Sequence, residues 1–209
     1  MIEFKNVYLK YIKGFFTLYN INFKINDNTL LVGDCTEGTN SIFRQIAKID
    51  TKYAGEIYVD DKNLKQIKDK ELDLAYVCTY PFLFKNKSIF DNLYYPLKIR
   101  KFKKNDAKTL INKYCQQFNI ENLDRKVKNL SFSEQKIVCL LRALVRKPKY
   151  VLIEHLFSDF DQSLIACANK IIEELKSHSI ILACEPDDKN LTAFANFSRI
   201  YLENGSIKD

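Results

Sequence analysis

The pattern of apolar and polar positions predicts an alternation of strands and helices. In residues 2–8 and 17–25 apolar side chains recur at about every second position, which is typical of antiparallel strands that bury one face. We interpret five short apolar runs as further strands, at residues 29–32, 55–59, 74–78, 150–153 and 180–184. Between them lie segments with helical spacing, which begin at residues 41, 88, 106, 133 and 161. This alternation indicates an α/β fold with a mainly parallel sheet.

The middle of the chain carries helical patterns without strands. We therefore expect one domain over residues 1–209, in which a helical subdomain of about residues 82–130 is inserted. The remaining core then comprises residues 1–81 and 131–209. Its two alternating N-terminal strands indicate an antiparallel β subdomain beside the parallel sheet.

The segment from Leu30 to Ser41 has the frame of a phosphate-binding loop. An apolar strand leads to Gly33, Gly38 follows five positions later, and a helix begins. In the pattern Gly-x-x-x-x-Gly-Lys-Ser/Thr, backbone N–H groups surround the phosphates, the lysine reaches the β- and γ-phosphates, and the hydroxyl binds Mg²⁺. Here Thr39 replaces the lysine and Asn40 replaces the hydroxyl residue. The candidate nucleotide-binding residues of the loop are Gly33, Asp34, Cys35, Thr36, Glu37, Gly38, Thr39, Asn40 and Ser41.

The composition narrows the possible classes of protein and their location in the cell. With 209 residues and 46% hydrophobic content, the chain can bury one substantial core. We expect a cytoplasmic protein, since no apolar run approaches the roughly 18 residues of a membrane span and the N-terminus lacks a signal-peptide pattern. The six cysteines stand singly in apolar surroundings, which favours reduced core thiols.

The net charge of +7 comes from lysines that are spread along the whole chain, most densely over residues 98–108. We interpret this run as a solvated surface, with contact to membrane headgroups or to a partner as the alternative. Nucleic-acid binding is not expected, because no basic stripe with interleaved aromatic residues stands out.

Further motifs follow the phosphate loop in a fixed order, and together they resemble the nucleotide-binding subunit of ATP-binding cassette (ABC) systems. Residues 129–136 (NLSFSEQK) resemble the LSGGEQQR signature of that family, and residues 150–161 (YVLIEHLFSDFD) resemble its Walker B strand and D-loop. Residues 76–81 resemble the Q-loop, with Thr79 in place of glutamine. The resemblance covers essentially the whole chain.

The resemblance implies a P-loop NTPase-type core and a set of site roles. It implies that Tyr11 stacks on the adenine of ATP, that Thr79 lies near the nucleotide, and that Asn40 and Glu154 bind Mg²⁺. It also places His155 at the catalytic carboxylate position and Glu185 at the switch histidine position. The signature loop, which in the family faces ATP held by an opposite subunit, corresponds to Ser131, Phe132, Ser133 and Glu134.

Several of these positions depart from the family pattern. Thr39 lacks the lysine charge, whose contact with phosphate contributes about 1.5 to 3 kcal/mol. His155 replaces the carboxylate that orients the attacking water, and the charge of Glu185 would repel the γ-phosphate. Phe132 and Ser133 replace two glycines at which close backbone approach requires the absence of side chains. We therefore expect a pseudo-ATPase with weak or absent ATP binding.

The main hypothesis is a degenerate cassette subunit of a membrane ABC complex, peripheral at the inner face of the cell membrane. Its expected partners are an integral membrane permease or envelope protein, and a second cassette with which it forms a homo- or heterodimer. One alternative is a regulatory or scaffold ABC protein that acts on the cell envelope. Another is an active but divergent ABC ATPase.

Overall fold

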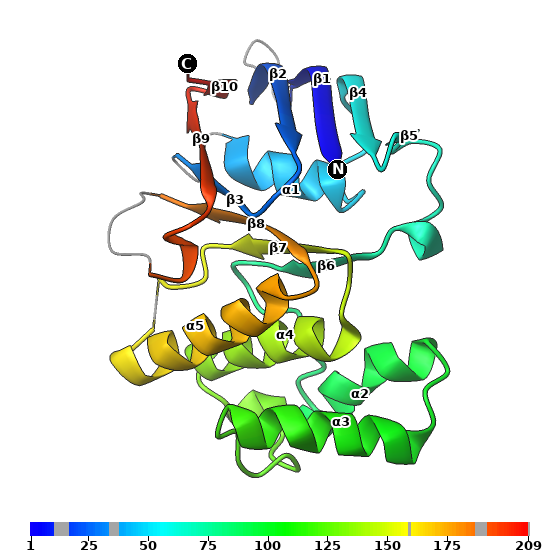
Figure 1. Cartoon of the computed structure of the whole chain (residues 1–209), viewed down its shortest axis with the longest axis vertical. Helices are drawn as coiled ribbons and strands as arrows, with labels where there is room; N and C mark the ends of the chain where they lie inside the picture. The colour runs from blue at the N-terminus through cyan, green and yellow to red at the C-terminus, as the bar shows by residue number, and fades with distance from the viewer. Residues whose placement is uncertain (11–16, 34–37, 159, 187–191, 209) are drawn as a thin grey trace. The chain divides into compact units, whose positions relative to one another are not determined.

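The computed structural model describes residues 1–10, 17–33, 38–158, 160–186 and 192–208 (Figure 1). The chain divides into two compact units. The first unit comprises residues 1–76, 150–155 and 180–209, and the second comprises residues 77–149 and 156–179. The first is built mainly on β-sheets and the second on helices. The predicted boundaries of the helical subdomain, about residues 82–130, stay a prediction.

One sheet of the first unit is antiparallel. Its strand order is β2-β1-β4-β5, and Ile2 at the start of β1 faces Ile25 in β2 and Val59 in β4. The alternating pattern of β1 places Ile2, Phe4 and Val7 in the core. The strands are β1 (Ile2–Leu9), β2 (Leu18–Ile25), β4 (Ala54–Val59) and β5 (Lys62–Asn63). The predicted antiparallel β subdomain is confirmed.

The other sheet is mainly parallel, with the order β10-β9-β3-β8-β7-β6. Strand β8 pairs in parallel with β3 and with β7, and β3 also pairs in parallel with β9. Only the terminal hairpin of β9 and β10 is antiparallel among the pairings described for this sheet. The strands are β3 (Thr29–Val32), β6 (Leu74–Val77), β7 (Tyr150–Glu154), β8 (Ile180–Glu185), β9 (Ser198–Glu203) and β10 (Ser206–Ile207).

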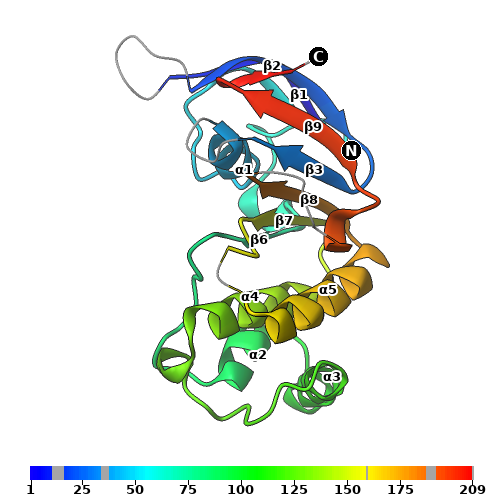
Figure 2. The same cartoon turned by 90° about the vertical axis from the view of Figure 1, so that its left-hand side faces the viewer.

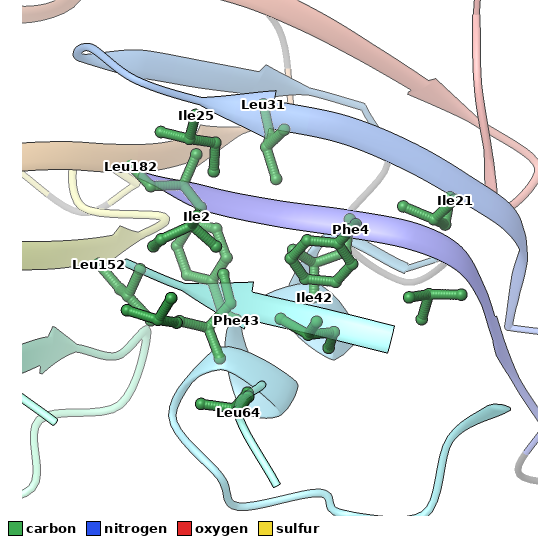
Figure 3. Close-up of a cluster of buried hydrophobic side chains, with 14 of the residues drawn as sticks. Ile2, Phe4, Ile21, Ile25, Leu31, Ile42, Phe43, Leu64, Leu152 and Leu182 are labelled. Atoms are coloured by element: carbon green, nitrogen blue, oxygen red, sulfur yellow. The ribbon is translucent and has the colours of Figure 1, made fainter. Parts of the chain in front are cut away.

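Helix α1 (Asn40–Ile46) supplies the centre of the core of the first unit. Phe43 and Ile42 pack there against side chains from both sheets, among them Phe4, Leu152 and Leu182 (Figure 3). Apolar residues at helical spacing continue to Ile49 in the sequence, but α1 ends at Ile46. The chain leaves the helix there because Lys48 adopts a left-handed conformation, with φ of 57°.

Four helices make up most of the second unit. They are α2 (Ile89–Ile99), α3 (Lys104–Gln117), α4 (Phe132–Arg146) and α5 (Gln162–Lys176). Helix α4 carries an almost continuous buried face and contacts α2, α3 and α5; its packing beside α5 can be followed in Figure 2.

Short 3₁₀ turns occur at Asp69–Glu71, Val127–Asn129 and Thr192–Phe194. Within the described ranges, no helix combines the length and apolarity that crossing a bilayer requires.

Replacing Phe43 by alanine tests the role of α1 in the core. The ring is fully buried, so Phe43→Ala should lower the free energy of unfolding by about 3 to 5 kcal/mol, through lost burial and a cavity. Urea unfolding followed by circular dichroism measures the change. Ile49→Ala is the control, because that side chain is 51% exposed and should change stability by only about 0.5 kcal/mol. Equal losses for the two variants would contradict the described packing.

Candidate functional site

Gly33 and Gly38, which lie between β3 and α1, pack closely against neighbouring segments. A Cβ atom on Gly33 would lie 2.3 Å from the backbone oxygen of Leu202. Gly38 has a φ of 150°, and a Cβ atom there would lie 2.7 Å from the Leu18 side chain. Backbone contact therefore excludes a side chain at Gly33, and the left-handed φ disfavours one at Gly38. The predicted loop residues 34–37 and Tyr11 lie outside the described residues.

The lysine position of the loop holds a buried hydroxyl. Thr39 has no exposed surface, and its Oγ1 atom lies 3.5 Å from Asn40 Oδ1. Ser41 is also buried in the first turn of α1, whereas Asn40 is partly exposed. A P-loop lysine would place an ammonium group at the phosphates, but Thr39 can offer only a neutral hydrogen bond.

Parallel pairing brings the predicted catalytic positions to one edge of the sheet. Val32 of β3 is in register with Glu185 of β8, and Glu154 of β7 is in register with Cys184 of β8. In addition, the backbone N–H of Gly33 donates to the carbonyl oxygen of Glu185 at 3.3 Å. The carboxyl ends of β3, β8 and β7 therefore meet beside the start of α1, the usual position of a site in parallel α/β sheets. Glu154 and Glu185 are both almost fully buried there.

His155 makes the most specific side-chain contacts at this edge. Its Nε2 atom lies 3.2 Å from Asn40 Oδ1 and 3.7 Å from the Cys184 sulfur. The backbone of His155 is left-handed, with φ of 44°, and its N–H donates to the Cys184 carbonyl oxygen at 3.1 Å. A left-handed conformation at a non-glycine residue is strained and often occurs at functional sites.

Cys184 is the contact that the sequence interpretation did not anticipate. It was interpreted as one of several core thiols, and it is fully buried as expected. Its closeness to His155 follows from the parallel pairing of β7 with β8. The sequence indicated that Cys184 lies near the site only through its position directly before the predicted switch residue Glu185.

The described part of the loop lacks the charged lysine of a complete P-loop. Mg²⁺ prefers oxygen ligands, and Asn40, Ser41 and Glu154 carry oxygen atoms at the expected positions. However, Asn40 Oδ1 already lies at hydrogen-bonding distance from an imidazole, and Thr39 supplies no charge. The imidazole would have to move before Asn40 could bind a hard cation.

The signature residues lie in the second unit and cap α4. Ser131 Oγ accepts a hydrogen bond from the Glu134 N–H at 3.1 Å, and the Glu134 carboxylate accepts one from the Ser131 N–H at 2.6 Å. Arg125 binds the same carboxylate at 2.7 Å. Although burial alone would raise it, the pKa of Glu134 is lowered by these hydrogen bonds and by the Arg125 charge. The loop therefore forms a reciprocal capping box at the start of its helix.

Phe132 and Ser133 differ in exposure. The Phe132 ring is 37% exposed and makes an edge contact with Tyr80, with 6.1 Å between ring centroids. Ser133 is buried. Thr79, which replaces the Q-loop glutamine, also belongs to the second unit. The structure thus brings Asn40, His155 and the ends of three strands together in the first unit, while the signature and Q-loop positions lie in the second.

Comparison with known proteins identifies the family. Residues 18–155 match the family described as "ABC transporter". The chain belongs to the ABC transporter family. The sn-glycerol-3-phosphate import ATP-binding protein UgpC of Bordetella avium is 30% identical over 180 residues, which cover 85% of this chain and 49% of that protein. The corresponding protein of Rhodopseudomonas palustris is 28% identical over 209 residues, which cover 99% of this chain and 58% of that protein. The chain thus spans about half the length of the curated relatives that it matches.

Solved ABC cassettes share the fold. A dimeric ATP-binding cassette in a post-hydrolysis state, bound to ADP and Pi, superposes with a TM-score of 0.84 at 22% identity, covering 100% of this chain and 97% of that chain. The ATP-binding subunit of an ABC transporter gives 0.86 at 18% identity, covering 100% and 88%. The predicted ABC ATPase fold is confirmed, and the roles assigned to individual site residues stay predictions.

The signature cap can be tested by removing its hydroxyl. Ser131→Ala should lower the free energy of unfolding by about 1 kcal/mol, because the Glu134 N–H loses its acceptor. Ser131→Thr keeps the hydroxyl and should lose less. Urea unfolding measures both variants, and an alanine variant as stable as the parent would contradict a capping role.

Proposed function

We propose that this chain is a degenerate ATP-binding cassette subunit of a membrane ABC complex, with weak or no ATP hydrolysis. The observation that carries the proposal is the 3.2 Å contact between His155 Nε2 and Asn40 Oδ1. It joins the residue at the catalytic carboxylate position to the residue at the magnesium position. A cassette of this kind would serve as a structural and coupling subunit of its complex, while a competent partner cassette would hydrolyse ATP.

Charge around the loop supports the same conclusion. Two buried carboxylate side chains, Glu154 and Glu185, lie at the ends of adjacent strands, and the lysine position is occupied by neutral Thr39. Phosphate groups approaching this edge would meet like charges without the lysine that normally compensates them. The missing contact is worth about 1.5 to 3 kcal/mol, which corresponds to roughly a tenfold to hundredfold loss in nucleotide affinity.

The second unit offers a surface that suits a membrane partner. Several of the exposed large apolar side chains lie within residues 80–102, and these are Tyr80, Phe82, Phe84, Tyr95, Ile99 and Phe102. Phe84 and Tyr95 make an edge contact with 4.9 Å between ring centroids, and each remains about half exposed. Exposed apolar side chains gathered in one segment often mark an interaction surface. We assign it to a permease at the inner face of the membrane, and we expect the chain to dimerise with another cassette.

Restoring the lysine tests the proposal directly. Purified chain should bind a fluorescent ATP analogue weakly in the presence of Mg²⁺, and Thr39→Lys should tighten binding about tenfold to hundredfold. The control is Thr109→Lys, which adds the same charge at an exposed position of α3 and should leave affinity unchanged. The same titration repeated without Mg²⁺ shows whether the metal contributes.

A steady-state ATPase assay completes the test. Turnover by the unmodified chain at the rates of ordinary cassettes, lost on His155→Ala, would refute the proposal and favour an active, divergent ABC ATPase. Absent or very slow turnover would support it.

A further inference from the structure

The turn that joins α2 to α3 carries a dense set of exposed cations. Residues 98–104 contain no acidic side chain, and their exposed cations are Lys98, Arg100, Lys101, Lys103 and Lys104. The chain reverses direction at Lys101, whose φ is 61°, and the Phe102 N–H donates to the Leu97 carbonyl oxygen at 3.0 Å. Figure 1 shows this turn at the end where the two helices are joined.

A second basic segment meets this turn at the end of α4. Arg100 Nη1 donates to the carbonyl oxygen of Arg146, the last residue of α4, at 2.8 Å. Lys147 and Lys149 follow and are exposed, and residues 142–149 contain no acidic side chain. The fold therefore joins two segments that are 46 positions apart in sequence. We call residues 98–104 and 146–149 together the basic surface.

Helix dipoles account for only part of this charge. Cations are favourable in the last turn of a helix, as for Lys98 in α2 and Arg146 in α4. Lys103 and Lys104 instead occupy the N-cap and the first position of α3, where positive charge is unfavourable. The Lys103 side chain makes no cap hydrogen bond, and Asp106 is the acid that the first turn of α3 offers against the two lysines. Both lysines therefore cost the helix stability.

Ion pairs within the chain do not account for these lysines either. Among the described residues, no carboxylate forms an ion pair with any of the four lysines of the turn, Lys98, Lys101, Lys103 and Lys104. Lysines elsewhere do form such pairs, for example Lys176 with Glu173 at 2.7 Å. At physiological salt the Debye length is about 8 Å, so the fields of neighbouring cations add. An anionic partner would relieve the repulsion between them.

Two exposed apolar side chains stand among the cations. Ile99 is 67% exposed and Phe102 is 44% exposed, and each has a cation directly before and after it in the sequence. Cations that contact lipid headgroups, combined with apolar side chains that enter the acyl boundary, are typical of proteins that bind a membrane surface. A nucleic-acid site would instead use aromatic rings for stacking, and the aliphatic Ile99 cannot stack on a base.

We propose that the basic surface binds anionic lipid headgroups at a membrane surface, with Ile99 and Phe102 inserted between them. A basic side chain near an anionic membrane strengthens binding about fivefold, so several together produce a stable contact. Ile99 and Phe102 form the end of the exposed apolar segment that was assigned to a permease, and they contact the lipid beside it. The inference goes beyond the proposed function, because this contact requires lipid alone.

Co-sedimentation of the purified full chain with lipid vesicles is the direct test. Vesicles of equal parts phosphatidylcholine and phosphatidylglycerol should bind the chain at least about tenfold more tightly than vesicles of phosphatidylcholine. Binding should weaken strongly in about 1 M NaCl, where the Debye length is about 3 Å. Equal binding to the two kinds of vesicle, or no binding to the anionic ones, would overturn the proposal.

A charge-matched pair of variants tests the location of the contact. The first combines Lys98→Gln, Lys101→Gln, Lys103→Gln and Lys104→Gln, and it should weaken binding to anionic vesicles by at least about tenfold. The control replaces four exposed lysines of the first unit by glutamine, namely Lys62, Lys65, Lys68 and Lys70. Residues 61–71 carry no exposed large apolar side chain, so the control should retain most of the binding. Equal losses in the two variants would mean that net charge alone attracts the chain, and would overturn the proposal.

The apolar part of the contact has its own variant. The double variant Ile99→Ser and Phe102→Ser keeps every charge and should weaken vesicle binding several-fold, because two apolar side chains no longer leave water. Ile49→Ser is the control, since Ile49 is 51% exposed in the first unit and should leave binding unchanged. Unchanged binding by the double variant, or release of the parent chain from vesicles by an equal mass of polyuridylic acid, would contradict a lipid site.

Thermal unfolding checks that the charge variant is folded. Lys103→Gln and Lys104→Gln remove unfavourable charge from the start of α3, so together they should keep or slightly raise the melting temperature. A fall would contradict the argument that these lysines cost the helix stability. Neither nucleotide binding nor ATPase activity enters the vesicle assay, so failure of the lipid site and failure of the proposed function are separate outcomes.

Discussion

Strand β8 is the element on which the site depends. It pairs in parallel with β3 on one side and with β7 on the other, and this double pairing aligns the carboxyl ends of three strands. The alignment places Gly33, Glu185 and the Glu154–His155 step at one edge. Because side chains in a strand alternate between faces, a one-residue slip of β8 would turn Cys184 away from His155. The register of a single buried strand therefore determines which chemical groups meet.

The two units carry different parts of the cassette. The first unit holds the loop frame and the strand ends, and its core is centred on α1 between two sheets. The second holds the signature segment, whose serine and glutamate satisfy the start of α4 locally. Its polar groups cap their own helix, and Phe132 occupies a position at which the family signature has a glycine. The capping box accounts for Ser131 and Glu134 of this segment.

Much of the fold could be predicted from apolar periodicity. The alternation in β1 and β2 predicted antiparallel strands. The helical spacing from residue 133 predicted α4, which the structure starts one residue earlier. The order of the motifs predicted the family, and the match of residues 18–155 to that family confirms it. The end of α1 was not predictable from spacing, because a left-handed residue at Lys48 stops the helix. The His155–Cys184 contact was also missed, since 29 residues separate the pair and only the register of β7 and β8 brings them together.

The packing at Gly33 changes how the loop should be interpreted in chains of this kind. Any side chain at that position would collide with the backbone of β9 at Leu202, so the demand for glycine originates in the sheet itself. A cassette could lose every trace of phosphate chemistry and still need this residue in order to fold. The two glycines of the motif are thus required by the packing of the fold, whereas the side chains that follow them determine the chemistry of the loop. In this chain the chemistry of the site depends instead on Thr39, Asn40 and the residues at the strand ends.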